Sequence, residues 1–392
     1  MKKYGLQPPY FIYNEKKIKS NLLKFREMLP KNFDIYYSIK ANPNHVILNI
    51  FRQLGVGAEI SSGGELDLVK NAGFVTNRII FTGPGKTTRE LERAILSKIY
   101  LIIVESLNEI KRINKIASKL KIKQKILIRI NPLIFCAQPD SMFPMIGGGQ
   151  KFGIDEEEIL NLIKAILLFE NIDISGFHFF TGSNIFDEQV IINNTEHLFK
   201  LVNSYELFFK RKFSIIDIGG GLALNYSQEN NKHFDIKKLT KGLSFLVEKY
   251  NLKDKNIIIE SGRFLVGESG EYIVEVVDVK ISRGETFVII NGGVNHISRA
   301  TLAKNGHEIE VMNKKVKNKK IKVSIFGNLN TPTDFITKTK LPVIKIGDII
   351  SIKKVGAYGL TSGMPLFTSR PFPREYLLML NNKVKNITNA RD

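Results

Sequence analysis

Short apolar segments alternate with amphipathic segments over the first two thirds of the chain. Runs of apolar residues between turn-forming residues predict strands near 34–40, 56–60, 78–82, 99–104, 125–131, 173–180, 213–218 and 256–260. Apolar positions at helical spacing predict helices at 64–72, 88–96, 107–120, 156–169, 187–209 and 236–250. Eight strand-then-helix units favour a closed (β/α)8 barrel. An open, doubly wound sheet is the alternative, but its Gly-x-Gly-x-x-Gly turn is missing after the first strand.

The two ends of the chain have a different pattern. Residues 9–14 are typical of one short strand, and a helix is expected over about 15–29. Beyond residue 265, Gly, Pro and Asn turns separate strands expected at 272–282, 285–291, 323–326, 348–353 and 376–381. We therefore expect an N-terminal strand and helix (1–32), an α/β barrel (33–265) and a β-rich C-terminal domain (266–392).

Composition narrows the class of protein. The chain has 43% hydrophobic and 24% charged residues, with no apolar run of 18 residues and no signal-peptide core, so we expect no membrane segment. Cys136 is the only cysteine, which excludes an internal disulfide and fits the cytoplasm. The net charge of +20 is spread along the chain without a nucleic-acid-binding motif. We expect no nucleic-acid partner, while an acidic protein partner stays open.

Polar residues and glycines occupy the positions at which the predicted strands end. Those strand ends carry Lys40, Glu59, Thr82-Gly83-Pro84-Gly85, Arg129, Phe180-Thr-Gly-Ser183, Gly219-Gly-Gly221 and Glu260-Ser-Gly-Arg263. A barrel gathers its chemistry at the C-terminal ends of its strands, so these residues are expected to meet at one mouth. Position alone does not separate a functional Lys40 from a lysine whose amine simply reaches solvent.

Four of these strand ends together suggest one cofactor. Gly219, Gly220 and Gly221 leave their backbone N–H groups open to an anion, and Ser183 and Arg263 extend this arrangement to a phosphate site. A carboxylate such as Glu260 can hold a protonated ring nitrogen, and a lysine can form a Schiff base with an aldehyde. This combination points to pyridoxal phosphate, with no metal site.

Several motifs carry a resemblance to a known family. They are Tyr37-Ser-Ile-Lys-Ala-Asn42, Lys151-Phe-Gly-Ile154, Gly182-Ser183, Asp217-Ile-Gly-Gly-Gly221, Glu260-Ser-Gly-Arg263 and Gly356-Ala-Tyr-Gly359. In order and over nearly the whole chain, they resemble the fold-type III pyridoxal-phosphate decarboxylases, which include diaminopimelate and ornithine decarboxylases. The resemblance implies a barrel followed by a β-sandwich-like domain that the N-terminal strand joins. It also implies a homodimer in which each active site is completed by the partner.

The resemblance assigns roles to the residues at the strand ends. It makes Lys40 the Schiff-base lysine and Glu260 the partner of the pyridine nitrogen. The glycine triplet, Ser183 and Arg263 would hold the phosphate, with Tyr358 reaching it from the second domain.

Further roles follow from the same resemblance. Glu59 and Arg129 match a polar pair near the imine and the ring hydroxyl. Asp334 matches an acidic residue that is supplied across the dimer interface and meets the distal group of the substrate.

Three features depart from the pattern of diaminopimelate and ornithine decarboxylases. Phe180 replaces a histidine that stacks on the cofactor ring, and an aromatic ring can stack without donating a proton. His178, two residues earlier, either takes over part of that role or is a packed histidine. Asn330 replaces a cysteine that is the expected proton donor, and an amide is no acid. Of the Arg-Pro-x-x-Tyr motif that binds diaminopimelate only Arg299 remains, which argues against lysine biosynthesis.

These departures resemble a branch acting on amino-acyl groups tethered to a carrier protein, or linked to exosortase gene clusters. The leading hypothesis is therefore a cytoplasmic pyridoxal-phosphate decarboxylase of a specialised pathway, acting on a small amino acid or a carrier-bound substrate. A cofactor-binding homologue that regulates a partner without catalysis is the alternative. An amino-acid racemase is a third reading, although no second base facing Lys40 is evident.

Overall fold

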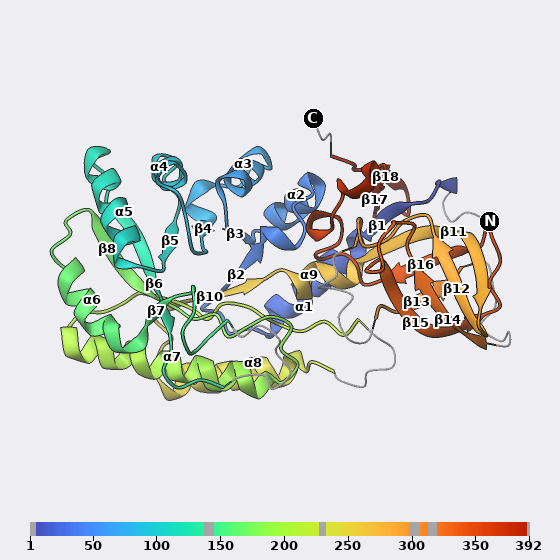
Figure 1. Ribbon diagram of the computed structural model, residues 1–392. Helices are drawn as coiled ribbons and strands as arrows, with labels where there is room; N and C mark the ends of the chain where they lie inside the picture. Colours follow the sequence, from blue (N-terminus) through green and yellow to red (C-terminus); the bar gives the residue numbers. More distant parts are fainter. Residues whose placement is uncertain (1–4, 137–144, 227–232, 298–305, 313–319, 390–392) are drawn as a thin grey trace. The chain divides into compact units, whose positions relative to one another are not determined.

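The chain folds into two compact units in a computed structural model that describes residues 5–136, 145–226, 233–297, 306–312 and 320–389 (Figure 1). One unit, the barrel unit, comprises residues 23–223 and 234–262. The other, the sheet unit, comprises residues 1–22, 224–233 and 263–392. Helix α1 (Glu15–Met28) runs from one into the other. Among the described residues, no helix is both long and apolar enough to span a membrane.

Eight parallel strands of the described residues form the barrel unit. They are β2 (Phe33–Ser38), β3 (Gly57–Ile60), β4 (Ile79–Phe81), β5 (Leu101–Val104), β6 (Gln124–Asn131), β8 (Ile172–His178), β9 (Ile215–Asp217) and β10 (Asn256–Ser261). Their order is β5-β4-β3-β2-β10-β9-β8-β6, and pairing of β5 with β6 closes the ring. The predicted (β/α)8 barrel is confirmed.

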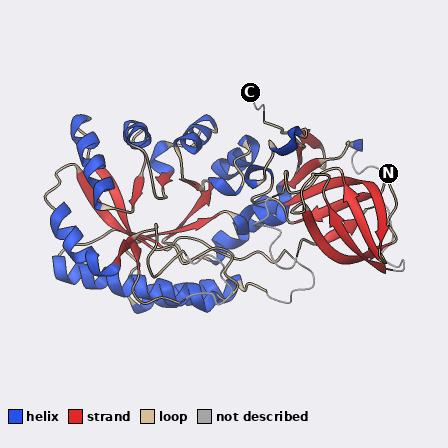
Figure 2. Ribbon diagram, viewed as in Figure 1, coloured by secondary structure: helices blue, strands red, loops and turns tan. Residues whose placement is uncertain are grey.

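The helices of the barrel unit lie around these strands (Figure 2). They are α2 (His45–Gln53), α3 (Gly63–Asn71), α4 (Thr88–Leu96), α5 (Leu107–Lys119), α6 (Ile159–Ile166), α7 (Glu188–Phe209) and α8 (Ile236–Lys249). The starts of α3, α4 and α5 are fixed alike, because the hydroxyl groups of Ser62, Thr87 and Ser106 each accept a backbone N–H three residues ahead. Such caps satisfy N–H groups that have no partner inside the helix.

The barrel interior is apolar at its middle level. Buried side chains from most of the strands pack there into one cluster, which contains Tyr36, Ile80, Leu101, Ile103, Leu127, Ile215 and Ile258. Burial of this much apolar surface fixes the strands in place. The polar strand ends therefore stand on a rigid base.

The sheet unit is built on a mixed sheet that includes the N-terminal strand. Strand β1 (Tyr10–Asn14) pairs antiparallel with β11 (Gly270–Ser282) and parallel with β17 (Arg374–Leu378). The remaining strands are β12 (Glu285–Ile290), β13 (Ile309–Val311), β14 (Lys320–Phe326), β15 (Phe335–Pro342), β16 (Ile349–Lys353) and β18 (Val384–Asn386). The expectation that the N-terminal strand joins the C-terminal domain is confirmed, and the sheet is curled (Figure 2).

Two local differences from the sequence-based prediction have physical reasons. Strand β2 ends at Ser38, and Ile39–Ala41 form a 3-10 turn, so Lys40 lies just beyond the strand. Asn42 and Pro43, which follow, do not continue a strand. Strand β15 was not predicted, because it is an edge strand in which lysines and threonines interrupt the apolar alternation.

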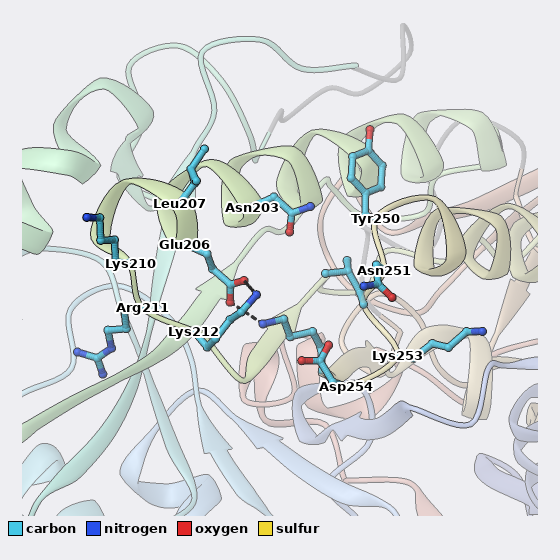
Figure 3. Close-up of a pocket in the computed structure, with 12 residues that line it drawn as sticks. Asn203, Glu206, Leu207, Lys210, Arg211, Lys212, Tyr250, Asn251, Lys253 and Asp254 are labelled. Carbon is cyan, nitrogen blue, oxygen red and sulfur yellow. Dashed lines mark hydrogen bonds and ion pairs between the residues drawn. The ribbon is translucent and has the colours of Figure 1, made fainter.

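One hollow opens at the opposite end of the barrel from the polar strand ends (Figure 3). Its lining comes from the segments that lead into β9 and β10, residues 203–212 and 250–255. At its floor, Glu206 accepts the Phe213 N–H at 2.6 Å, the Lys255 Nζ at 2.5 Å and the Lys212 Nζ at 3.0 Å. Glu206 thereby ties the end of α7 to the starts of both strands.

Glu206→Gln should lower the free energy of unfolding at pH 7 by about 1–3 kcal/mol, because Lys255 is buried and loses its charged partner. Burial alone would raise the pKa of Glu206, but the donors from Lys255, Phe213 and Lys212 outweigh it and lower that pKa. A lowered folded pKa stabilises the fold above about pH 4.3 and loses that effect as the pH falls through the folded pKa.

Denaturant titration at several pH values measures this difference between wild type and variant. Glu248→Gln is the matched control, since Glu248 and its partner Lys253 are both largely exposed. Equal unfolding free energies for Glu206→Gln and wild type at pH 7 would contradict this account.

Candidate active site

Lys40 and Glu59 form an ion pair at the C-terminal ends of β2 and β3. The Lys40 Nζ lies 2.9 Å from both carboxylate oxygens of Glu59. The Glu59 side chain is fully buried, whereas that of Lys40 is 41% exposed. Glu59 therefore holds the amine in place from the buried side, while the Lys40 side chain stays accessible to a reactant.

Glu59 is kept ionised by its neighbours. Burial would raise the pKa of Glu59, but the charge of Lys40 and hydrogen bonds from Thr82, Ser38 and Lys40 outweigh burial and lower it. The Thr82 hydroxyl donates a short hydrogen bond to Glu59 Oε1. A buried carboxylate with these donors holds Lys40 in one position.

Arg129, on β6, is held by a different carboxylate. Its Nη1 donates to Glu105 Oε1 at 3.1 Å, and Glu105 Oε2 accepts the Gly153 N–H at 2.9 Å. The guanidinium lies 4.6 Å from the ring centroid of Phe152 and 5.8 Å from that of Phe180. Glu59 and Arg129, expected as a pair, thus have separate partners.

His178, Asp217 and Glu260 form a buried cluster on β8, β9 and β10. Parallel register places Arg129 beside His178 and His178 beside Asp217, while Glu260 lies two residues beyond Ile258, the neighbour of Asp217. One polar atom of each of the three lies within 4.8 Å of the others. Their side chains are at most 3% exposed. The register predicts this meeting, because residues two apart on a strand share a face.

The three groups of this cluster are driven toward their neutral forms. Burial lowers the pKa of His178 well below its ordinary value, and the charges of Arg129, Lys40 and Lys86 lower it further. Burial, followed by mutual repulsion with Asp217 and with Glu59, raises the pKa of Glu260 well above its ordinary value. Glu260 Oε1 has no hydrogen-bond partner among the described residues. A carboxyl in this state is suited to a partner that brings positive charge.

The glycine triplet after β9 is required by its own packing. Gly219 and Gly221 have φ of +66° and +91°, a backbone region that favours glycine. A Cβ on Gly219, Gly220 or Gly221 would approach the carbonyl oxygens of Phe179, Glu260 and Gly182, respectively, to within 2.1–2.4 Å. The turn therefore brings backbone, without side chains, to the mouth of the barrel beside Glu260. Ser183, exposed after β8, lies one residue beyond Gly182.

Two of the expected phosphate residues meet in the sheet unit. The Arg263 guanidinium donates a short hydrogen bond to the Tyr226 hydroxyl and lies 4.7 Å from the ring centroid of Tyr358. Arg263 begins α9 (Arg263–Val266) and follows directly on Gly262, the last residue of the barrel unit. Tyr358 has a positive φ of 53°.

Asn330 and Asp334 occupy one loop of the sheet unit but differ in environment. Asn330 is exposed. Asp334 is 1% exposed and accepts the backbone N–H of Val294 at 2.8 Å and of Leu329 at 2.7 Å. This geometry braces two loops and leaves Asp334 no exposed surface for a substrate. Arg299 lies outside the described residues.

Three residues that build the site were not among the predicted site residues. Asp217 was visible only as part of a motif, Glu105 as the residue after β5, and Phe152 within Lys151-Phe-Gly-Ile154. A charged residue that directly follows an apolar strand was the available signal for Glu105. Nothing local in the sequence pairs it with Arg129, because that contact depends on closure of the barrel.

Comparison with known proteins finds relatives that match nearly the whole chain. The profile described as "Pyridoxal-dependent decarboxylase, pyridoxal binding domain" matches residues 15–267. L-glutamyl-[BtrI acyl-carrier protein] decarboxylase of Niallia circulans is 32% identical over 387 residues, covering 95% of this chain and 89% of that protein. 2-[(L-alanin-3-ylcarbamoyl)methyl]-2-hydroxybutanedioate decarboxylase of Staphylococcus aureus is 30% identical over 384 residues, covering 95% and 94%.

A solved structure resembles this chain over nearly its whole length. Diaminopimelate decarboxylase from Helicobacter pylori, complexed with L-lysine, superposes with a TM-score of 0.90 at 31% identity. The match covers 98% of this chain and 94% of that one.

Asp334→Ala should lower the free energy of unfolding by about 1–3 kcal/mol, because two buried N–H groups lose their acceptor. Denaturant titration measures this, with the exposed neighbour Thr333→Ala as the matched control. A variant of unchanged stability that shows only a raised KM would contradict a bracing role and favour contact with the substrate.

Proposed function

Because the chain belongs to the family of pyridoxal-dependent decarboxylases, we propose that Lys40 and the residues around it form the site of decarboxylation of an amino acid or amino-acyl group. The protein is an enzyme of the lyase class that uses pyridoxal phosphate.

One observation carries the assignment of the site. The exposed amine of Lys40 follows β2, and the unpartnered carboxyl oxygen of Glu260 lies on β10, which pairs with β2. A pyridoxal ring needs a free amine for its aldehyde and a carboxylate for its nitrogen. The buried, orphaned Glu260 Oε1 is the kind of atom that a protonated ring nitrogen satisfies. The residues present therefore fit the cofactor.

The remaining contacts of the cofactor are proposed as follows. The N–H groups of Gly219, Gly220 and Gly221 and the hydroxyl of Ser183 would bind the phosphate. For Arg263 and Tyr358, which contact each other within the sheet unit, a phosphate-binding role remains what the family resemblance implies. The aromatic face of Phe180, which lies near the Arg129 guanidinium, would stack on the ring.

When bound, pyridoxal phosphate supplies an electron sink for the bond that loses CO₂. This chain's own residues orient the reacting groups and supply a proton. Glu59 holds the Lys40 Nζ in place and favours its ammonium form, so that this atom has a proton to give. The Asn330 amide can hydrogen-bond a substrate but cannot deliver a proton. We therefore assign proton delivery to Lys40 Nζ.

An amino-acyl substrate fits this chain better than free diaminopimelate. The motif expected for diaminopimelate is reduced to Arg299, and Asp334 is turned inward to backbone N–H groups. The Niallia circulans relative is named for a glutamyl group on an acyl-carrier protein. The net charge of +20 would attract an acidic carrier. A homodimer with shared sites and a cytoplasmic location remain predictions of the family resemblance.

A second candidate function is cofactor binding without turnover. The observation that favours it is the exposed amide of Asn330 at the position of an expected thiol. Such a protein would show the absorbance of a lysine-bound cofactor, lost in Lys40→Ala, and yet release no CO₂.

CO₂ release from purified, cofactor-saturated protein decides between these functions. We expect release from one or more amino acids or carrier-loaded glutamyl groups, and a fall of at least about 10³-fold in Lys40→Ala, because that variant loses the nucleophile. Release from meso-diaminopimelate should be slower than from the preferred substrate. Preference for meso-diaminopimelate would contradict the substrate proposal, and no release from any α-amino acid or amino-acyl carrier would contradict the enzymatic role.

A further inference from the structure

Two carboxyl groups of the barrel, those of Asp217 and Glu260, have oxygens within 4.8 Å of each other, and among the described residues no lysine or arginine forms an ion pair with either. Asp217 is fully buried and Glu260 is 3% exposed. His178, the third member of their cluster, has a pKa held well below its ordinary value by burial, so it is neutral at pH 7.

The cations around this cluster already have carboxylates of their own among the described residues. Lys40 pairs with Glu59 at 2.9 Å and Arg129 with Glu105 at 3.1 Å. Farther out, the buried Lys86 pairs with Glu109 at 2.8 Å. Each pair balances its own charge. Two ionised carboxylates at Asp217 and Glu260 would therefore leave uncompensated negative charge in a medium of low dielectric constant.

The orphaned atoms of the cluster show what is missing. Asp217 Oδ2 and Glu260 Oε1 have no hydrogen-bond partner among the described residues. Ionised carboxylates only accept hydrogen bonds, so these two groups cannot satisfy each other without a proton. Asp217 Oδ1 accepts the Gly219 N–H at 2.8 Å, which leaves Oδ2 as the atom free to carry one.

We propose that Asp217 is a positioning residue that carries a proton on Oδ2 at neutral pH and donates it in a hydrogen bond to the carboxylate of Glu260. Glu260 then holds the single negative charge of the cluster and presents Oε1, the oxygen without a partner among the described residues, to a cationic ring nitrogen. His178 stays neutral beside them, with its Nε2 3.8 Å from Glu260 Oε1.

This inference rests on the proposed function only in naming the ring nitrogen as the partner of Glu260. Strong burial raises the pKa of Asp217 well above its ordinary value and the charge of Glu59 adds to this, although the Gly219 N–H, the charge of Arg129 and a hydrogen bond with Glu260 act in the opposite direction. A protonated aspartic acid has the shape and the hydrogen-bonding pattern of asparagine. Asparagine at position 217 can accept from Gly219 and donate to Glu260, whereas alanine can do neither.

Infrared spectra of the cofactor-free protein at pH 7 test the proton directly. The C=O stretch of a protonated carboxyl group should be present in the wild-type spectrum and absent from that of Asp217→Asn, so that it appears as a band in the difference spectrum between the two. Labelling with [¹³C]aspartate should shift the same band in the unaltered protein. A band that neither the substitution nor the label affects overturns the proposal.

Cofactor affinity provides the second measurement, followed by absorbance on titration with pyridoxal phosphate. Asp217→Asn should bind within about threefold of wild type, and Asp217→Ala about tenfold or more weakly, because the variant loses a hydrogen bond to a charged group. ¹⁵N NMR of bound, ¹⁵N-labelled pyridoxal phosphate should show a protonated nitrogen in wild type and in Asp217→Asn.

Equal losses of affinity in Asp217→Asn and Asp217→Ala would mean that the negative charge of Asp217 is required, and would overturn the proposal. Circular dichroism checks the fold of both variants, and the label experiment needs no variant. If wild type binds no pyridoxal phosphate while the carboxyl band behaves as expected, the proposed function fails and the assignment of the Asp217 proton stands.

Discussion

The charge of Glu59 lies where no solvent reaches it, and the amine of Lys40 is the group that balances it. A buried, unpaired carboxylate would cost several kcal/mol or take up a proton, so the pair is a condition of this fold as well as a feature of its chemistry. The same contact fixes where the amine can be. The Lys40 side chain is 41% exposed while its amine is bound to Glu59, so it is accessible in a defined position.

Other buried charged groups at the mouth of the barrel differ in whether they have a partner of opposite charge. Arg129 and Lys86 each form a buried ion pair with a carboxylate of the barrel unit. Glu260 differs, because its Oε1 is buried without a partner among the described residues. This carboxyl oxygen is therefore suited to a partner that brings positive charge. Glu260 lies on β10 and Lys40 directly follows β2, the strand that pairs with β10, which fits the proposed pyridoxal-phosphate site.

Much of the barrel was readable from the sequence because each strand is a local apolar run and each helix has its own periodicity. The residues at strand ends could be named for the same reason. Partners could not, since the pairing of Arg129 with Glu105 depends on barrel closure and register. For Asp334, the motif suggested contact with the substrate, and nothing in the sequence indicated that its carboxylate also accepts two backbone N–H groups; the substrate contact stays a prediction. Strand β15 was missed because its exposed edge carries polar side chains.

The most direct test of this account is to identify the residue that holds the cofactor. Borohydride reduction of the protein with pyridoxal phosphate fixes the cofactor to the lysine that binds it, and peptide mass spectrometry then locates the added mass. We predict the label on the peptide that contains Lys40, with none there in Lys40→Ala. A label on another lysine, or no label on a folded and cofactor-saturated protein, would contradict the assignment of this site.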